Sequence, residues 1–361
     1  MKILVLVDKE PHLLLNPYIY TLMDNINQQF CDVEWGYGLN VFWSDQCFNY
    51  DIIHIHWPQI LAWYNHRKLN IEDIAKRLKE VKEKGIKIIS TCHNFAPHYN
   101  SSKLYNALYN LVYNESECIL HLGKYSLNIF KEKYPATLNI LLHHHIYDTV
   151  YKNKPTFEES IKALSLSPNM KYLLCFGEFR ANEERRMIIE LSQYLKGRNL
   201  KILAPSFCII PKRRNLCIVF KMIVKFLWYK YKYHGDIIFE RKPIDDNKLL
   251  YYYGASDISL IPRLNILNSG NVPLGFLMKN VVVGPNVGNI KEILEETGNP
   301  TFNPNDMHSL FLAIKEAQKM SEEQKGLKNY QYAIEHWSTN IIAQKLYQSY
   351  KQTLNYKVVK I

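Results

Sequence analysis

The residues best suited to chemistry lie in a polar turn between two apolar runs in the second half of the chain. Asn268, Ser269, Gly270 and Asn271 follow the apolar run 258–261 and lead into a second one. A helix that begins at such a turn offers unpaired backbone N–H groups and the positive end of its dipole to an anion, and Asn268 or Ser269 is suited to cap it. We therefore predict a diphosphate site at these four residues.

A second flexible turn and an arginine support this interpretation. Residues 284–289, with the sequence GPNVGN, follow the next apolar run. Arg180 comes directly after the apolar run 172–177, and its planar guanidinium suits a phosphate. Ordinary strand-to-helix turns have the same composition, so a purely structural role stays open for both turns. Arg185 and Arg186 are better explained as the solvated start of a helix, since glutamates lie beside them.

Histidines gather in the first half of the chain. His54, His56 and Trp57 stand at the end of one apolar run, and His93 follows the next one in a loop with asparagine and proline. A neutral imidazole there can act as a general base or bind a sugar hydroxyl, and the Trp face suits a sugar ring. His93 is our candidate catalytic residue, whereas His54 and His56 fit a structural role equally well.

We predict no metal site. The run His143, His144 and His145 resembles a ligand set, but adjacent residues of a strand point to opposite faces. No carboxylate or cysteine pattern accompanies the run, as a metal site would require.

The basic charge of the chain, +11 overall, is concentrated in one segment. Residues 212–235 contain seven Lys or Arg and no acid, and Arg214, Lys221, Lys225 and Lys232 form a stripe at helical spacing among apolar and aromatic residues. This pattern is typical of a helix lying on an anionic membrane surface. A helix that packs its apolar side on the protein, with its lysines in water, is the other interpretation. No nucleic-acid-binding motif accompanies the charge, so we expect no nucleic-acid partner.

The elements that must position these residues follow from the apolar pattern. With 361 residues, 47% of them hydrophobic, the chain is long enough for two domains. Short apolar runs alternate with amphipathic stretches, pause at 148–168, and then alternate again, which predicts two α/β halves with parallel sheets. Ligands of such sheets bind beyond the carboxyl ends of the strands, and the candidate residues fall there.

The location of the protein is also suggested by the sequence. The first apolar run, 3–7, is shorter than the roughly 7–15 residues of a secretory core, and no run reaches the ~20 of a membrane span. The seven cysteines show no CxxC spacing and fit reduced thiols. We expect a cytoplasmic protein, either free or attached to the inner face of the plasma membrane through 212–235.

Taken in order, several segments resemble GT-B glycosyltransferases, specifically the family-4-like bacterial enzymes that build surface polysaccharides. They are NPY at 16–18, DIIHIHWPQ at 51–59, TCHNFAPH at 91–98, HLGKYS at 121–126, FGEFR at 176–180, ASDISLIPRLNILNSGN at 255–271 and NVVVGPNVGNIKEIL at 280–294. The order of the segments is more specific than any one of them.

The resemblance implies two Rossmann-like domains facing across a cleft. Residues 1–150 would form the acceptor-side domain, 151–335 the donor-binding domain, and 336–361 a helix that packs back on the first. Arg180 and the amides of residues 269–271 would hold the donor diphosphate, and His93 would lie near the reacting sugar. The nucleotide sugar would be a substrate, with no cofactor and no metal.

The chain departs from this family at several positions. Many relatives carry two glutamates eight positions apart, where this sequence has Ile266 and Leu274. The lysine of a common Arg-x-x-Lys pair is Glu183, so the cationic partner is missing or moved to Arg185. The usual glycine before the run at 281 is Lys279. These departures mark a divergent member.

The leading expectation is a hexosyltransferase-type enzyme. It would move a sugar from a nucleotide-diphosphate sugar to a polysaccharide or lipid-linked acceptor at the cytoplasmic membrane face. Three alternatives stay open: a non-catalytic GT-B relative that acts as a scaffold or partner subunit, another nucleotide-sugar enzyme such as an epimerase, and a lipid- or nucleic-acid-binding module.

Overall fold

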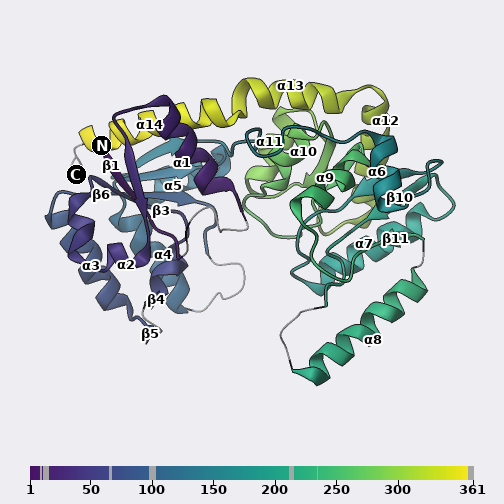
Figure 1. The fold of residues 1–361 in the computed structure, drawn as a ribbon, viewed down its shortest axis with the longest axis horizontal. Helices are drawn as coiled ribbons and strands as arrows, with labels where there is room; N and C mark the ends of the chain where they lie inside the picture. Colours follow the sequence, from purple (N-terminus) through teal and green to yellow (C-terminus); the bar gives the residue numbers. More distant parts are fainter. Residues whose placement is uncertain are drawn as a thin grey trace. The chain divides into compact units, whose positions relative to one another are not determined.

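The computed structural model divides into two compact units, Met1–Val150 with His336–Ile361, and Tyr151–Glu335 (Figure 1). We call them unit 1 and unit 2. The structure describes residues 1–8, 10, 16–64, 67–96, 103–210, 215–233 and 235–356. Each unit is built on one six-stranded parallel sheet, which confirms the predicted α/β architecture with two Rossmann-like halves.

The sheet of unit 1 has the strand order β2-β1-β3-β6-β7-β8. Its strands are β1 (Lys2–Val5), β2 (Glu34–Tyr37), β3 (Ile52–Ile55), β6 (Lys87–Cys92), β7 (Cys118–His121) and β8 (Leu138–Leu141). The apolar runs form strands because both faces of a parallel sheet are covered, and Ile3, Leu4 and Val5 are indeed fully buried. A short antiparallel pair, β4 (Trp63–Tyr64) and β5 (Arg67–Lys68), lies outside the sheet.

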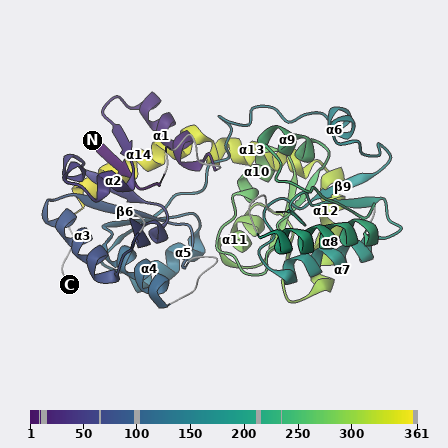
Figure 2. The same cartoon turned by 60° about the horizontal axis from the view of Figure 1, so that its bottom comes forward.

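Helices cover both faces of this sheet (Figure 2). On one face lie α3 (Ile71–Glu83), α4 (Lys103–Glu115) and α5 (Lys124–Lys133), and on the other α1 (Tyr18–Gln29) and α14 (Thr339–Asn355). A short helix, α2 (Leu39–Phe42), follows β2. Asn70 caps α3 with its side chain, which accepts a hydrogen bond from the Asp73 N–H at 2.7 Å.

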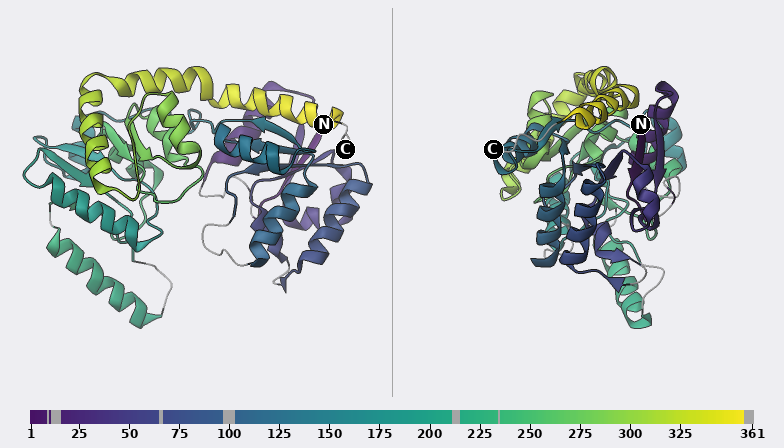
Figure 3. Two further views of the ribbon diagram at one scale, coloured as in Figure 1. Left: turned by 180° about the vertical axis from the view of Figure 1, so that it is seen from behind. Right: turned by 90° about the vertical axis from the view of Figure 1, so that its left-hand side faces the viewer.

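The C-terminal helix α14 packs against α1, as predicted for a helix that returns to the first domain (Figure 3). The Phe30 and Tyr347 rings stack with centroids 3.7 Å apart. At the start of the helix, the Thr339 hydroxyl donates to Asp148 at 2.5 Å. These contacts tie the end of the chain to its beginning.

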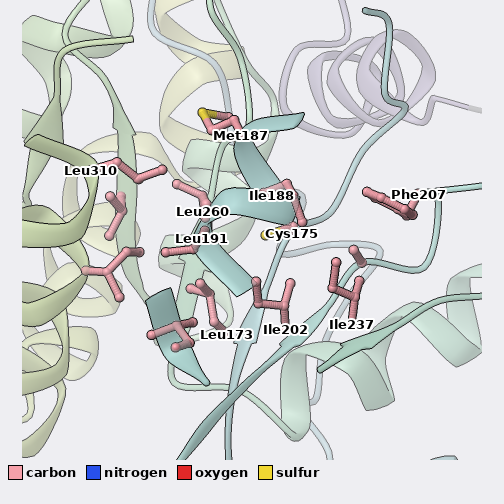
Figure 4. Packing of buried hydrophobic residues seen from close by; sticks show 14 of the residues in the cluster. Leu173, Cys175, Met187, Ile188, Leu191, Ile202, Phe207, Ile237, Leu260 and Leu310 are labelled. Carbon is pink, nitrogen blue, oxygen red and sulfur yellow. The ribbon is translucent and has the colours of Figure 1, made fainter. Parts of the chain in front are cut away.

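The sheet of unit 2 has the order β11-β10-β9-β12-β13-β14. Its strands are β9 (Lys171–Leu174), β10 (Leu200–Leu203), β11 (Ile237–Ile238), β12 (Ile258–Leu260), β13 (Val281–Pro285) and β14 (Thr301–Phe302). Its helices are α6 (Phe157–Leu164), α7 (Asn182–Leu195), α8 (Leu216–Lys232), α9 (Asp246–Gly254), α10 (Asn271–Leu277), α11 (Gly288–Glu296), α12 (Met307–Glu322) and most of α13 (Lys325–Trp337), whose last two residues belong to unit 1. Figure 4 shows Ile188 of α7 and Leu310 of α12 packed with Leu173 and Ile202 of the sheet.

In both sheets the strand order reverses beside the strand that comes first in its unit. In unit 1 the reversal lies between β1 and β3, and in unit 2 between β9 and β12. At such a reversal the loops leave the sheet in opposite directions, and the crevice beyond the carboxyl ends of the strands is where open α/β sheets bind ligands.

Several element ends differ from those that the apolar pattern predicts. The strand expected over 172–177 ends at Leu174, the strand expected over 138–143 ends at Leu141, and the helix expected over 271–279 ends at Leu277. Lys279 has φ = 56°, a left-handed conformation that favours glycine, in keeping with the glycine expected there from the resemblance. Lys279 and Asn280 thereby leave the helix and lead directly into β13.

Candidate functional site

The loop after β9 in unit 2 passes very close to two other segments. Gly177 has φ = 112°, and a Cβ atom on it would lie 3.0 Å from Asn271 Nδ2 and 3.6 Å from Arg263 Nη2. The same Asn271 Nδ2 donates to the Phe176 carbonyl at 2.7 Å. Only glycine combines this φ with this approach, so the loops after β9 and β12 and the start of α10 meet at one point.

A buried ion pair supports this junction. Arg263 Nη1 lies 2.9 Å from Glu184 Oε2, and the two side chains are 7% and 6% exposed. The same carboxylate oxygen accepts from the backbone N–H groups of Arg180 at 2.6 Å and Ala181 at 3.3 Å, while Arg263 also donates to the Glu178 carbonyl. Buried charges persist when they are paired and hydrogen-bonded, as here. The result is a fixed guanidinium beside Gly177.

Arg263 and its partner Glu184 were missed by the sequence reasoning. The available signal was an arginine directly after a buried strand, inside the apolar run 258–267. Glu184 was interpreted as a solvated charge beside Arg185 and Arg186, but it is buried and pairs with a residue from another loop.

The predicted diphosphate residues lie together at the carboxyl end of this sheet. The cap of α10 is Gly270, which corrects the predicted cap at Asn268 or Ser269. The Ser269 hydroxyl still accepts from the Asn271 N–H, at 3.3 Å. Asn268 Oδ1 instead accepts from Asn289 Nδ2 at 2.7 Å, because its side chain is turned toward the second glycine-containing turn.

That second turn packs against the first. Gly288 has φ = 56°, and a Cβ on it would lie 2.6 Å from the Ile266 carbonyl oxygen. Ile266 and Leu274, the positions at which the resemblance leads one to expect two glutamates, are buried. Apolar packing therefore occupies both positions.

The arginines after β9 have different roles. The Arg185 guanidinium donates to the carbonyls of Phe207 at 3.0 Å, Ala181 at 3.2 Å and Phe179 at 3.0 Å. Because its donors bind three carbonyls from two segments of backbone, it does not replace the missing cationic partner. Arg180 has an exposed side chain at the loop, and its predicted role in binding phosphate stays a prediction.

In unit 1, His93 follows β6 and pairs with His56, which follows β3. Their Nε2 and Nδ1 atoms lie 3.2 Å apart, and the His93 ring stacks on Trp57 with centroids 5.0 Å apart. Burial holds the pKa of His56 well below its usual range, with His54 adding to the effect. A neutral His56 keeps an uncharged nitrogen against His93 Nε2 and so orients the His93 ring. The end of the predicted loop 91–98 lies outside the described residues.

A tyrosine forms the centre of this cluster. The Tyr18 ring lies against His56, His93, His144 and His145, with centroid distances of 5.7, 5.2, 4.5 and 5.1 Å. Its hydroxyl is buried without a hydrogen-bond partner among the described residues, and burial raises its pKa. The sequence predicted that residues 143–145 alternate across a strand. Since β8 ends at Leu141, two of these histidines instead face the same ring.

Two buried histidines are structural. His54 bonds Tyr350 through Nδ1 and Thr91 through Nε2, both at 2.8 Å, and His145 Nδ1 accepts from the Tyr147 N–H at 3.1 Å. Burial, reinforced by His93, lowers the pKa of His54 to about 3. In the described part of the chain, no group of three or more His, Cys, Asp or Glu is placed to hold a metal ion.

A groove near the ends of β1 and β2 was also missed. It measures about 640 Å³, and aromatic rings and carboxylates line it. Trp63 and Tyr37 are 53% and 42% exposed there, and Asp8 and Glu10 stand on the same lining. Exposed aromatic rings beside hydrogen-bond acceptors suit the apolar face and hydroxyls of a sugar. The signal was a first strand followed by two acids, Asp8 and Glu10, with Trp63-Tyr64 far away in sequence.

Solved structures of other proteins have the same architecture as this chain. No protein-family model matches the sequence, and no curated protein sequence matches it. Among solved structures, sucrose-phosphate synthase from Thermosynechococcus elongatus superposes with a TM-score of 0.71 at 12% identity, over 98% of this chain and 99% of that one. Anabaena HepE, solved with UDP and glucose, has a TM-score of 0.68 at 13% identity, over 97% and 99% of the two chains.

An enzyme with a different activity also has a structure similar to that of this chain. A putative UDP-N-acetylglucosamine 2-epimerase from Listeria monocytogenes has a TM-score of 0.59 at 12% identity, over 98% of this chain and 96% of that one. Because the likeness covers nearly the whole chain while identity is low, it speaks for the fold. The chain has the GT-B fold, two Rossmann-like domains in succession, on which glycosyltransferases are built.

Proposed function

We propose that this protein is a glycosyltransferase that moves a hexosyl group from a nucleotide-diphosphate sugar to a saccharide or lipid-linked acceptor. The observation that carries the proposal is the junction in unit 2, where the Gly177 loop, the Arg263 guanidinium and the start of α10 converge at the reversal of strand order. The likeness to HepE, solved with UDP and glucose, supports it.

The chemistry of the donor follows from this junction. Cleavage of the glycosidic bond leaves the new negative charge on the nucleotide diphosphate. Fixed donors aimed at that charge stabilise it in the transition state, because they need no reorganisation as it develops. In this proposal Arg263, Arg180 and the amides of residues 269–271 supply those donors. Together they perform the neutralisation that a divalent cation performs elsewhere.

The acceptor is activated in unit 1. His93 hydrogen-bonds the acceptor hydroxyl or the reacting sugar, and His56 is a positioning residue that holds the His93 ring. Because the lowered pKa keeps His56 neutral, a proton taken from the acceptor hydroxyl stays on His93 and does not pass to His56. The aromatic groove with Trp63 and Tyr37 receives a sugar of the acceptor.

The donor site is tested by thermal shift with UDP, GDP and ADP. A ligand at a hundred times its Kd stabilises the folded protein by about 2.7 kcal/mol, so a true donor nucleotide produces a clear rise in Tm. Arg180→Ala removes an exposed side chain and should reduce that rise without lowering the Tm of the free protein. The matched control is Arg186→Ala, another exposed arginine of the same region. Stabilisation by none of the three nucleotides would overturn the donor site.

Epimerisation is the second candidate, because the Listeria enzyme shares the fold. The two reactions separate when nucleotide sugar is supplied without acceptor. A new nucleotide-sugar isomer would establish the epimerase. Transfer to an added saccharide or lipid-linked acceptor, lost in His93→Ala, would establish the transferase. Nucleotide binding without either product would identify a non-catalytic relative.

A further inference from the structure

Helix α8 of unit 2 has almost no buried side chains. It runs from Leu216 to Lys232, and the Asn215 side chain caps it by accepting from the Cys217 N–H at 2.9 Å. Phe226 is its one buried residue, although most of its residues are apolar or aromatic. Figures 1 and 3 show α8 at the periphery of unit 2. Residues 212–214 of the predicted basic segment, Arg214 among them, and residue 234 lie outside the described residues.

One face of α8 is attached to the domain. The Phe226 and Phe239 rings lie 5.3 Å apart, and the Tyr229 and Phe207 rings 5.2 Å apart. Val219 and Ile223 also pack against the unit 2 core. The second interpretation of the sequence is a helix that packs its apolar side on the protein. This face of α8 fits that interpretation.

The neighbouring face of the helix is also apolar, and it is exposed. Leu216, Phe220, Val224, Leu227 and Tyr231 are 85%, 67%, 51%, 58% and 87% exposed. They recur at spacings of three and four residues, which aligns them along one side of a helix. Trp228, 49% exposed, lies beside them. We call these six residues the α8 stripe. A contiguous apolar stripe of this kind marks an interaction surface.

Lysines border the stripe on both edges. At 100° per residue Lys221, Lys225 and Lys232 fall beside Trp228, and Lys230 falls on the other edge, beyond Leu216. Lys232 Nζ lies 4.7 Å from the Trp228 ring centroid. The helix contains no Asp or Glu. A second copy of the helix would bring lysines against lysines, whereas an anionic surface is complementary to this border.

We propose that the α8 stripe docks on an anionic lipid surface. The helix lies in the plane of the interface, its apolar side chains enter the headgroup boundary and its lysines meet lipid phosphates. Trp228, apolar with one polar edge, suits that depth. No helix in the described ranges is long and apolar enough to cross a membrane, in keeping with a helix that lies on the surface. The inference goes beyond sugar transfer and does not depend on it.

The test is co-sedimentation of the full chain with vesicles. Phosphatidylcholine vesicles are compared with vesicles that also contain phosphatidylglycerol, at low and high salt. Binding should require phosphatidylglycerol and decrease with salt. Lys221→Glu/Lys225→Glu should weaken it by at least tenfold, since each lysine near the surface accounts for roughly a fivefold change in partition. Phe220→Ser/Leu227→Ser should abolish it.

Matched controls come from helix α12 of the same unit. Leu312→Ser changes another exposed leucine, and Lys315→Glu/Lys319→Glu removes two exposed lysines. Both should bind vesicles like the wild type. All variants should keep the wild-type Tm and nucleotide-induced shift, so a failure of lipid binding is distinguishable from a failure of the donor site.

Three outcomes would overturn the proposal. The first is no binding to mixed vesicles, and the second is equal binding by the α8 variants and the α12 controls. The third is a dimer in size-exclusion chromatography that Phe220→Ser/Leu227→Ser dissociates, without lipid binding, because it would assign the stripe to a second copy of the chain.

Discussion

Both units have a reversal of strand order, but the side chains beside the two reversals differ in their chemistry. In unit 2 the crevice holds a buried ion pair, in which Glu184 and the Glu178 carbonyl fix the Arg263 guanidinium. In unit 1 the corresponding loops bring together neutral imidazoles and aromatic rings around Tyr18. A fixed cation suits a diphosphate, and a neutral, partly apolar environment suits a hydroxyl or a sugar ring. The fold provides the crevice, and the side chains decide its ligand.

The largest expected difference between the two units is their sensitivity to acid, which should destabilise unit 1 before unit 2. Burial lowers the pKa of His54 to about 3, of His144 to about 3, and of His145 and His121 to about 4. The unfolded chain binds protons below about pH 6.5 and the folded chain does not, so stability falls as pH drops from about 6.5 toward 4. At pH 5 each group costs about 2 kcal/mol.

The measurement is urea unfolding between pH 7.5 and 4.5, followed by hydrogen exchange in each unit. The described histidine of unit 2, His308, is on the surface, so protection in β9 and β10 should persist to lower pH than protection in β1 and β3. Equal loss in both units would contradict the assignment of acid sensitivity to the histidine cluster.

Breaking the ion pair should have the largest effect in unit 2. Glu184→Ala leaves the Arg263 guanidinium buried without its partner, which costs about 3–5 kcal/mol in the free energy of unfolding. The double variant Glu184→Leu/Arg263→Met should recover most of that loss, because apolar residues can replace a buried pair, but it should not bind nucleotide. Urea denaturation measures the first effect and thermal shift the second. A single variant as stable as the wild type would show that the pair is dispensable.

Adding a methyl group at Gly177 should separate binding from stability. Gly177→Ala strains a backbone with φ = 112° and pushes against Asn271, at a cost of about 1–3 kcal/mol, and should abolish the nucleotide-induced rise in Tm. The control is Gly197→Ala, where φ = 77° but nothing lies within 4 Å of the added atom. That variant should lose stability and keep nucleotide binding. If both variants kept nucleotide binding, the close approach at Gly177 would be irrelevant to the ligand.

Removing an aromatic ring from the unit 1 groove should have the smallest effect on stability. Trp63 is half exposed, so Trp63→Ala should change the free energy of unfolding by less than about 0.5 kcal/mol. It should nevertheless raise the KM for a saccharide acceptor several-fold and leave nucleotide binding unchanged. An unchanged KM would remove the groove from the acceptor site.

The sequence predicted elements better than contacts. The strand Cys118–His121 and the helix Asp246–Gly254 have the predicted bounds, because apolar periodicity and caps act over a few residues. The cap of α10 and the end of β8 differ from the predicted ones, and tertiary contacts lie near both: the Gly288 turn packs on Ile266, and the Tyr18 ring stacks on His145. The sequence also did not identify Arg263, because its partner Glu184 comes from another segment of the chain.

By itself the sequence determined that this chain forms two parallel sheets, where most of their strands lie along the chain, and which loops carry glycine, arginine and histidine. It did not predict the short edge strand β14. Only the tertiary structure decided the partners: Glu184 for Arg263, 79 residues away, and His56 for His93, 37 residues away. The physical reason is that strand order brings distant loops to one edge of a sheet. A periodic pattern predicts that a strand is buried, but it does not predict which strand lies beside it.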